Sequence, residues 1–103
     1  MQATLHLPGA APRILTQTEL TALNLGRSLQ PQNGPLLREL LGTEVPDELL
    51  ASEANRYAII GAENAADYDF GPTPSATADF ARLTGLTPDE SEPLVGPLLI
   101  IEA

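Results

Sequence analysis

Three carboxylates and one amide follow the most apolar stretch in the middle of the chain. Glu63, Asn64, Asp67 and Asp69 lie within residues 62–72. Their oxygen atoms are the ligands that Ca²⁺ and Mg²⁺ prefer, and loops that follow strands are frequent ligand sites. The spacing, however, matches no EF-hand loop. We therefore predict a solvated acidic loop that contacts a partner, and we expect neither a metal site nor a cofactor.

Two arginines are candidates for binding an anion. Arg56 directly precedes the apolar run 57–60, and Arg82 lies in a predicted helix. A guanidinium group pairs with carboxylates through two parallel hydrogen bonds, and acids outnumber bases in this chain, so pairing within the molecule is the expected state of both. Together with Glu63, Asp67 and Asp69, Arg56 completes the predicted partner-binding residues.

His6 is the single histidine, and histidine is the side chain best suited to proton transfer near neutral pH. It alternates with Thr4 on the polar side of the first predicted strand. A catalytic histidine needs a nucleophile or an orienting carboxylate nearby, and the sequence shows neither. We expect an exposed or structurally hydrogen-bonded residue, and we assign no catalytic residue.

The chain lacks most of the groups that enzymes use. It has no cysteine and no lysine, which excludes disulfides, thiolate metal sites, cysteine nucleophiles and Schiff bases. The sequence contains no dinucleotide-binding, P-loop, zinc-protease or serine-hydrolase motif. A carboxylate-based reaction remains as an alternative, because paired acids alone can catalyse hydrolysis.

The charge is strongly negative. Fourteen acids and five arginines give a net charge of −9. Binding to nucleic acid or to an anionic membrane requires basic contacts, so we expect neither. Attraction to a basic protein surface is compatible with this charge, as is a simple role of the acids in solubility.

The 103 residues are enough for one domain, residues 1–103, and 43% of them are hydrophobic, which is enough for one core. There is no signal-peptide pattern and no apolar run long enough to cross a bilayer. With the absence of cysteine, this predicts a cytoplasmic protein.

Strands are predicted from apolar patterning. Residues 3–7 alternate with one apolar side, and 13–15 return after the Pro8–Gly9 turn, so a hairpin with one buried face is expected. The uninterrupted runs within 56–61 and 98–101 predict central strands that are buried on both faces.

Helices are predicted from start and stop signals. Thr16 and Glu19 form a capping box, and Gly26 is the expected end of that helix. Proline within the first turn and glycine after the last residue mark the others. The expected helices begin near Thr16, Pro35, Pro46, Pro74 and Thr87.

Three pieces of the sequence resemble a family of small proteins of unknown function found in phages and mobile elements. They are a strand from Thr4 to Leu7 that enters a turn, a leucine helix that ends at Gly26, and a last strand introduced by Gly96. The similarity covers the first quarter and the last dozen residues. It implies a phage or mobile-element context and adds no catalytic residue.

The sequence therefore predicts a single α+β domain with a small mixed sheet of three to five strands and four or five short helices, packed mainly on one side. The function it favours is a non-catalytic protein-interaction domain, an inhibitor or adaptor that docks on a basic protein surface. A small ligand-binding or enzymatic domain that uses residues 62–72 is the alternative.

Overall fold

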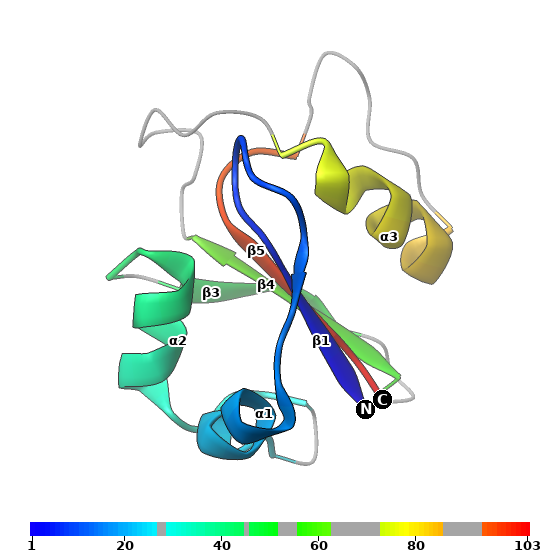
Figure 1. Ribbon diagram of the computed structural model, residues 1–103. Coiled ribbons are helices and arrows are strands. Elements are labelled where there is room, and N and C mark those ends of the chain that lie inside the picture. Colours follow the sequence, from blue (N-terminus) through cyan, green and yellow to red (C-terminus); the bar gives the residue numbers. More distant parts are fainter. Residues whose placement is uncertain (27–28, 45, 52–55, 63–72, 86–93) are drawn as a thin grey trace.

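The computed structural model describes residues 1–26, 29–44, 46–51, 56–62, 73–85 and 94–103 (Figure 1). The strands are β1 (Gln2–His6), β2 (Arg13–Ile14), β3 (Pro46–Ala51), β4 (Tyr57–Ala62) and β5 (Leu98–Glu102). The helices are α1 (Gln17–Leu23), α2 (Gly34–Leu41) and α3 (Ser75–Thr84). The predicted α+β class is confirmed.

The strands form one sheet in the order β2-β1-β5-β4-β3. Every neighbouring pair is antiparallel, so the mixed sheet that we expected is wrong. Four strands have five or six residues, and β2 is a two-residue strand at one edge. The last strand along the chain, β5, lies at the centre between β1 and β4, as the apolar run 98–101 predicted.

Alternate residues of the three central strands form two separate apolar layers. Leu5 of β1, Leu99 of β5 and Ile60 of β4 lie in one cross-strand row, and their side chains point to the first face. The next row contains Ile100 and Ile59, which point to the second face. Both layers are buried, and the sheet therefore has no face that is open along its whole width.

Helices α1 and α2 cover the first face (Figure 1). Leu20 and Leu23 of α1 are buried there with Leu37 and Leu41 of α2. The helical spacing of these leucines gives each helix one apolar side, which packs on the sheet while the polar side faces solvent.

Helix α3 covers the second face, where Ala76, Phe80 and Leu83 pack on Ile59 and Ile100. Our expectation of helices mainly on one side is thus wrong, and the fold has three layers with the sheet in the middle (Figure 1). Which face of the sheet each helix meets is decided by long-range packing.

The start of α1 has the predicted capping box. The Thr16 hydroxyl accepts a hydrogen bond from the Glu19 amide, and the Glu19 carboxylate accepts one from the Thr16 amide. The helix ends at Leu23, before the predicted Gly26, because Asn24 takes the left-handed conformation with φ 54°. Asparagine tolerates that conformation better than most residues with a side chain.

Residues 46–51 form strand β3, which overturns the helix that Pro46 and the following acids predicted. β3 pairs along its length with β4, with a bulge between Glu48 and Leu50. Three helices are present in the described ranges against the four or five expected. The expected helix at Thr87 lies outside the described residues.

Candidate functional site

Arg56 is the only one of the four predicted partner-binding residues within the described ranges. It is exposed, and it lies directly before β4, where its carbonyl accepts a hydrogen bond from the Ala103 amide at 2.9 Å. Glu63, Asp67 and Asp69 lie outside the described residues. The flanking described residues, Ala62 and Thr73, are at the end of the sheet away from Arg56, because Ala62 ends β4 and Thr73 is bonded to the residues that precede β5.

Polar side chains link β1, α3 and β5 on the second face of the sheet. His6 Nδ1 is 3.0 Å from the Ser75 hydroxyl, and His6 Nε2 is 3.2 Å from the Asp79 carboxylate. Arg82 extends this series of hydrogen bonds, since it donates to Asp79 at 3.1 Å and to both oxygens of Glu102 at 2.8 and 3.0 Å. We call these five side chains the His6 network.

The positions of these residues follow from local structure. Ser75, Asp79 and Arg82 are four and three residues apart on α3, and this spacing places them on one side of the helix. His6 and Glu102 share the second face because β1 and β5 are antiparallel and pair Gln2 with Glu102. The first residue of α3, Ser75, thus contacts β1, and the last turn of α3, which contains Arg82, contacts β5.

The burial of His6 corrects our view of β1. Its side chain is 1% exposed and that of Thr4 is 6% exposed, so the polar side of the strand is covered as well as the apolar side. A buried polar group is costly unless it is hydrogen-bonded. Both ring nitrogens of His6 have partners, and no buried side-chain nitrogen or oxygen among the described residues lacks one.

The partners fix the tautomer of neutral His6. A carboxylate only accepts hydrogen bonds, so Nε2 must carry the proton that it donates to Asp79. Nδ1 is then an acceptor, and the Ser75 hydroxyl donates to it. This order of serine, histidine and carboxylate is the order found in serine nucleophile sites. The 1% exposure of His6, however, leaves the ring out of reach of an external substrate.

The network also changes the acid–base behaviour of Arg82. Hydrogen bonds to Glu102, and after them those to Asp79, raise the pKa of Arg82 above its ordinary value, so this guanidinium stays charged. On α1, the hydrogen bond from Arg13, followed by the one from the Thr16 amide, lowers the pKa of Glu19. The predicted pairing of Arg82 with acids of the same chain is confirmed.

The start of α3 is held by Thr73, which is fully buried. Its amide donates to the Leu94 carbonyl at 2.8 Å, and its hydroxyl donates to the Gly96 carbonyl. These bonds attach the first turn of α3 to the segment that precedes β5. They thereby hold Ser75 beside His6, the last residue of β1.

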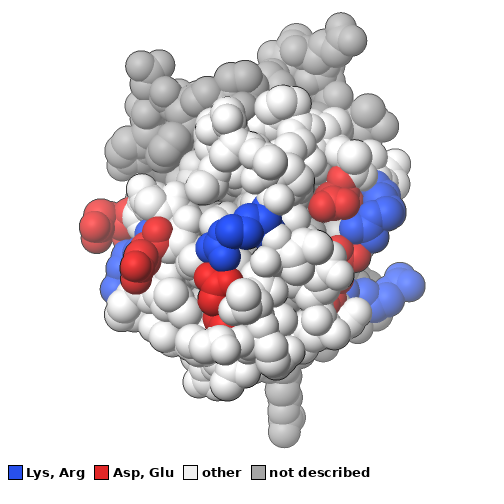
Figure 2. Space-filling view, in the orientation of Figure 1, with Lys and Arg blue, Asp and Glu red and all other residues white. Residues whose placement is uncertain are grey.

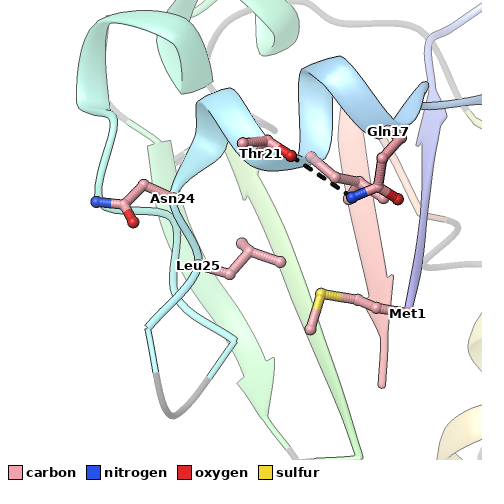
Figure 3. Close-up of a pocket in the computed structure, with 6 residues that line it drawn as sticks. Met1, Gln17, Thr21, Asn24 and Leu25 are labelled. Carbon is pink, nitrogen blue, oxygen red and sulfur yellow. Dashed lines mark hydrogen bonds between the residues drawn. The ribbon is translucent and has the colours of Figure 1, made fainter.

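A pocket of about 330 Å³ lies between α1 and the first residue of the chain (Figure 3). The Met1 and Leu25 side chains lie below α1, and Gln17 donates to Thr21 across the helix surface at 3.5 Å. No charged side chain lines this pocket. The side chains of its lining offer amide and hydroxyl groups for orientation but no carboxylate, imidazole or amine.

On the face of the molecule in Figure 2, acidic and basic side chains of the described residues lie next to one another in small groups, with uncharged surface between them. The ion pairs among the described residues are those of Arg13 with Glu19, of Arg82 with Asp79 and Glu102, and of His6 with Asp79.

Sequence reasoning missed Ser75 and Asp79. Their i, i+4 spacing after the Thr73–Pro74 helix start placed them together, but nothing in the sequence showed that this side of the helix meets His6. Within the described ranges, no group of three or more histidine, cysteine, aspartate or glutamate side chains is arranged to hold a metal ion. No helix in those ranges is both long and apolar enough for a membrane span.

Comparisons with known proteins add no relative. No protein-family model matches this chain, and neither a curated protein nor a solved structure matches it.

Proposed function

We propose that this protein is a small, acidic, non-catalytic interaction domain that docks on a basic surface of a protein partner. The observation that carries the proposal is the distribution of its charge. Segments 52–55, 63–72 and 86–93 contain one, three and three acids and no base, which is seven negative charges of the net −9. In the described part of the chain, Arg13 and Arg82 pair with Glu19, Asp79 and Glu102.

The environment of the histidine supports a non-catalytic role. His6 is covered by α3, and both of its nitrogens are engaged by residues of the same chain. The pocket beneath α1 is lined by no charged side chain. A docking function needs none of this chemistry and uses the excess charge directly.

The resemblance to small phage and mobile-element proteins suggests a biological context for the proposal. We place this protein in the cytoplasm as an inhibitor or adaptor, which accords with a chain that has no cysteine. The genes that neighbour its own provide a direct check, since phage or mobile-element genes are expected beside it.

The experiment is a measurement of association rate against salt. The partner is first captured from the native host and identified by mass spectrometry, and its association is then followed by stopped-flow fluorescence. Between about 50 and 500 mM salt the screening length falls from roughly 14 to 4 Å, and the association rate should drop about tenfold or more. The dissociation rate should change much less, because attraction acts chiefly on encounter.

Charge-neutralised variants separate attraction from other salt effects. The double variant Asp67→Asn/Asp69→Asn should slow association at low salt and reduce the salt dependence. Glu39→Gln, on the exposed side of α2, is the control and should change the rate less than twofold. An acidic partner, or an association rate that does not respond to salt, would contradict the proposal.

A further inference from the structure

Strand β3 is the last strand at one edge of the sheet. Its six residues, Pro46–Ala51, pair with β4 on one side, and no strand of the described part pairs with the other side. An edge strand of this length presents a row of backbone amide and carbonyl groups that another strand can use.

The opposite edge of the sheet differs in length and in charge. β2 has only two residues and pairs only with Thr4 and Leu5 of β1. Proline, which lacks an amide proton, stands at both edges, as Pro12 directly before β2 and as Pro46 at the first position of β3. The Arg13 side chain on this edge is already bound to Glu19 at 2.8 and 3.0 Å. The β2 edge is therefore short and carries a base, whereas the β3 edge is long.

The chain around β3 is acidic. Residues 44–55 contain four acids and no base, and two of the acids, Asp47 and Glu48, are in β3 itself. Glu44 on the approach to the strand is exposed. It takes no part in the ion pairs of the described residues, which use Glu19, Asp79 and Glu102.

We propose that the outer edge of β3 binds an extended basic segment of the protein partner as a sixth strand of the sheet. This inference rests on the proposed function, and it assigns a place and a conformation to the contact. Backbone hydrogen bonds provide the attachment in this mode of recognition. Basic side chains opposite Asp47 and Glu48 form favourable cross-strand pairs, whereas a second copy of this chain would bring like charges together.

The probe for this contact is a blocked seven-residue peptide with the sequence Thr-Arg-Val-Arg-Val-Arg-Thr. Two further peptides serve as comparisons: one has glutamate in place of each arginine, and one is the basic peptide with N-methyl groups on its five central amides. Titration of the isotope-labelled protein should shift the backbone amide resonances of residues 47–51 with the basic peptide alone. Loss of selectivity for the unmethylated peptide would overturn pairing through the backbone.

Two double variants with the same charge change locate the site. Asp47→Asn/Glu48→Gln should weaken binding of the basic peptide by about fivefold. Asp89→Asn/Glu90→Gln, which makes the same two substitutions outside β3 and outside the predicted partner-binding residues, is the matched control and should weaken it less than twofold. The amide resonances of β4 confirm that the first variant keeps its sheet. A larger effect of the control variant, or shifts confined to other elements, would overturn the inference.

The same variants distinguish the two proposals on the native partner. If its association depends on salt but does not respond to Asp47→Asn/Glu48→Gln, the β3 contact is wrong and the docking function stands. If its association does not depend on salt, the docking function itself is wrong. A concentration-dependent dimer in light scattering, with shifts at residues 47–51, would assign this edge to a second copy and overturn the inference.

Discussion

At the scale of single residues, His6 shows how a polar group is accommodated in a small core. Its ring is almost fully buried, and it satisfies one hydroxyl and one carboxylate of α3. Apolar contacts hold α3 on the sheet with little directional preference, whereas the ring accepts only one pairing of Ser75 and Asp79. The histidine thereby specifies the position of the helix as well as stabilising it.

Removal of the ring should cost more than removal of one of its partners. We expect His6→Ala to lower the free energy of unfolding by about 2 kcal/mol or more, since it leaves a cavity and two polar groups without their bonds. Ser75→Ala deletes only one hydroxyl and should cost about 1 kcal/mol. Urea denaturation of both variants measures the difference, and an equal or reversed order would show that the ring is not the centre of the network.

The same residues mark the limit of sequence reasoning about the site. The residue types were visible, and the pairing of Arg82 with acids followed from charge numbers. The contact of His6 with Ser75 and Asp79 depends on the placement of α3 over β1. These two elements lie about 70 positions apart in the chain. No local pattern records such a contact, because the same side of α3 would be equally polar if it faced water.

At the scale of elements, local chemistry determined most starts and ends. The capping box of α1, the proline in the first turn of α2 and Gly85 after α3 are where the sequence predicted them. β3 was mistaken for a helix because Pro46, Asp47 and Glu48 suit a helix start, whereas proline and acids are depleted in strands. Pairing with β4 decides between them, and that pairing is a tertiary contact.

The start of α1 should loosen in acid. Bonds from Arg13 and from the Thr16 amide lower the pKa of Glu19 in the folded state, so the folded protein binds this proton more weakly than the unfolded chain does. The stabilisation is therefore complete above the ordinary glutamate pKa and is lost as the pH falls through the lowered value. Amide resonances of residues 16–19, followed from pH 6 to 2, report the change.

Glu19→Gln is the control for that titration, because glutamine keeps the capping geometry and does not ionise in this range. Its amide resonances at residues 16–19 should be nearly independent of pH. An unchanged titration in the variant would assign the acid response to another carboxylate.

The position of a strand in the sheet should decide its tolerance to charge. Ile100 of β5 is 1% exposed, and Ile100→Asp should lower the free energy of unfolding by about 3 kcal/mol or more because it buries an unpaired charge. Ile14 of β2 is 61% exposed, and the same substitution there should cost about 0.5 kcal/mol or less. Thermal melts of the two variants test the contrast, and similar losses would contradict the central placement of β5.

At the scale of the whole molecule, the described part of the fold combines two apolar layers with the ion pairs of Arg13 and Arg82. The composition alone indicated the acidity of the protein. Which acids pair with Arg13 and Arg82 needed the structure, because the fold brings Glu102 of β5 to Arg82 of α3.

The net charge of −9 should prevent direct binding to nucleic acid. We expect no saturable change in fluorescence anisotropy with a labelled DNA duplex or a single-stranded RNA at about 150 mM salt, up to about 100 µM protein. Lower salt should not produce binding either, since repulsion between like charges grows as screening falls. A complex that tightens at low salt would contradict this expectation.

The central position of β5 has a consequence for the order of folding. The two sides of the sheet, β1 with β2 and β3 with β4, touch each other only through β5, which is the last strand along this sequence. During synthesis the two hairpins can form early, but neither can gain its central neighbour until residues 98–102 have left the ribosome. Pairing of Gln2 with Glu102 then closes a loop of nearly the whole chain, so we expect folding on the slow scale of non-local sheets, milliseconds to seconds.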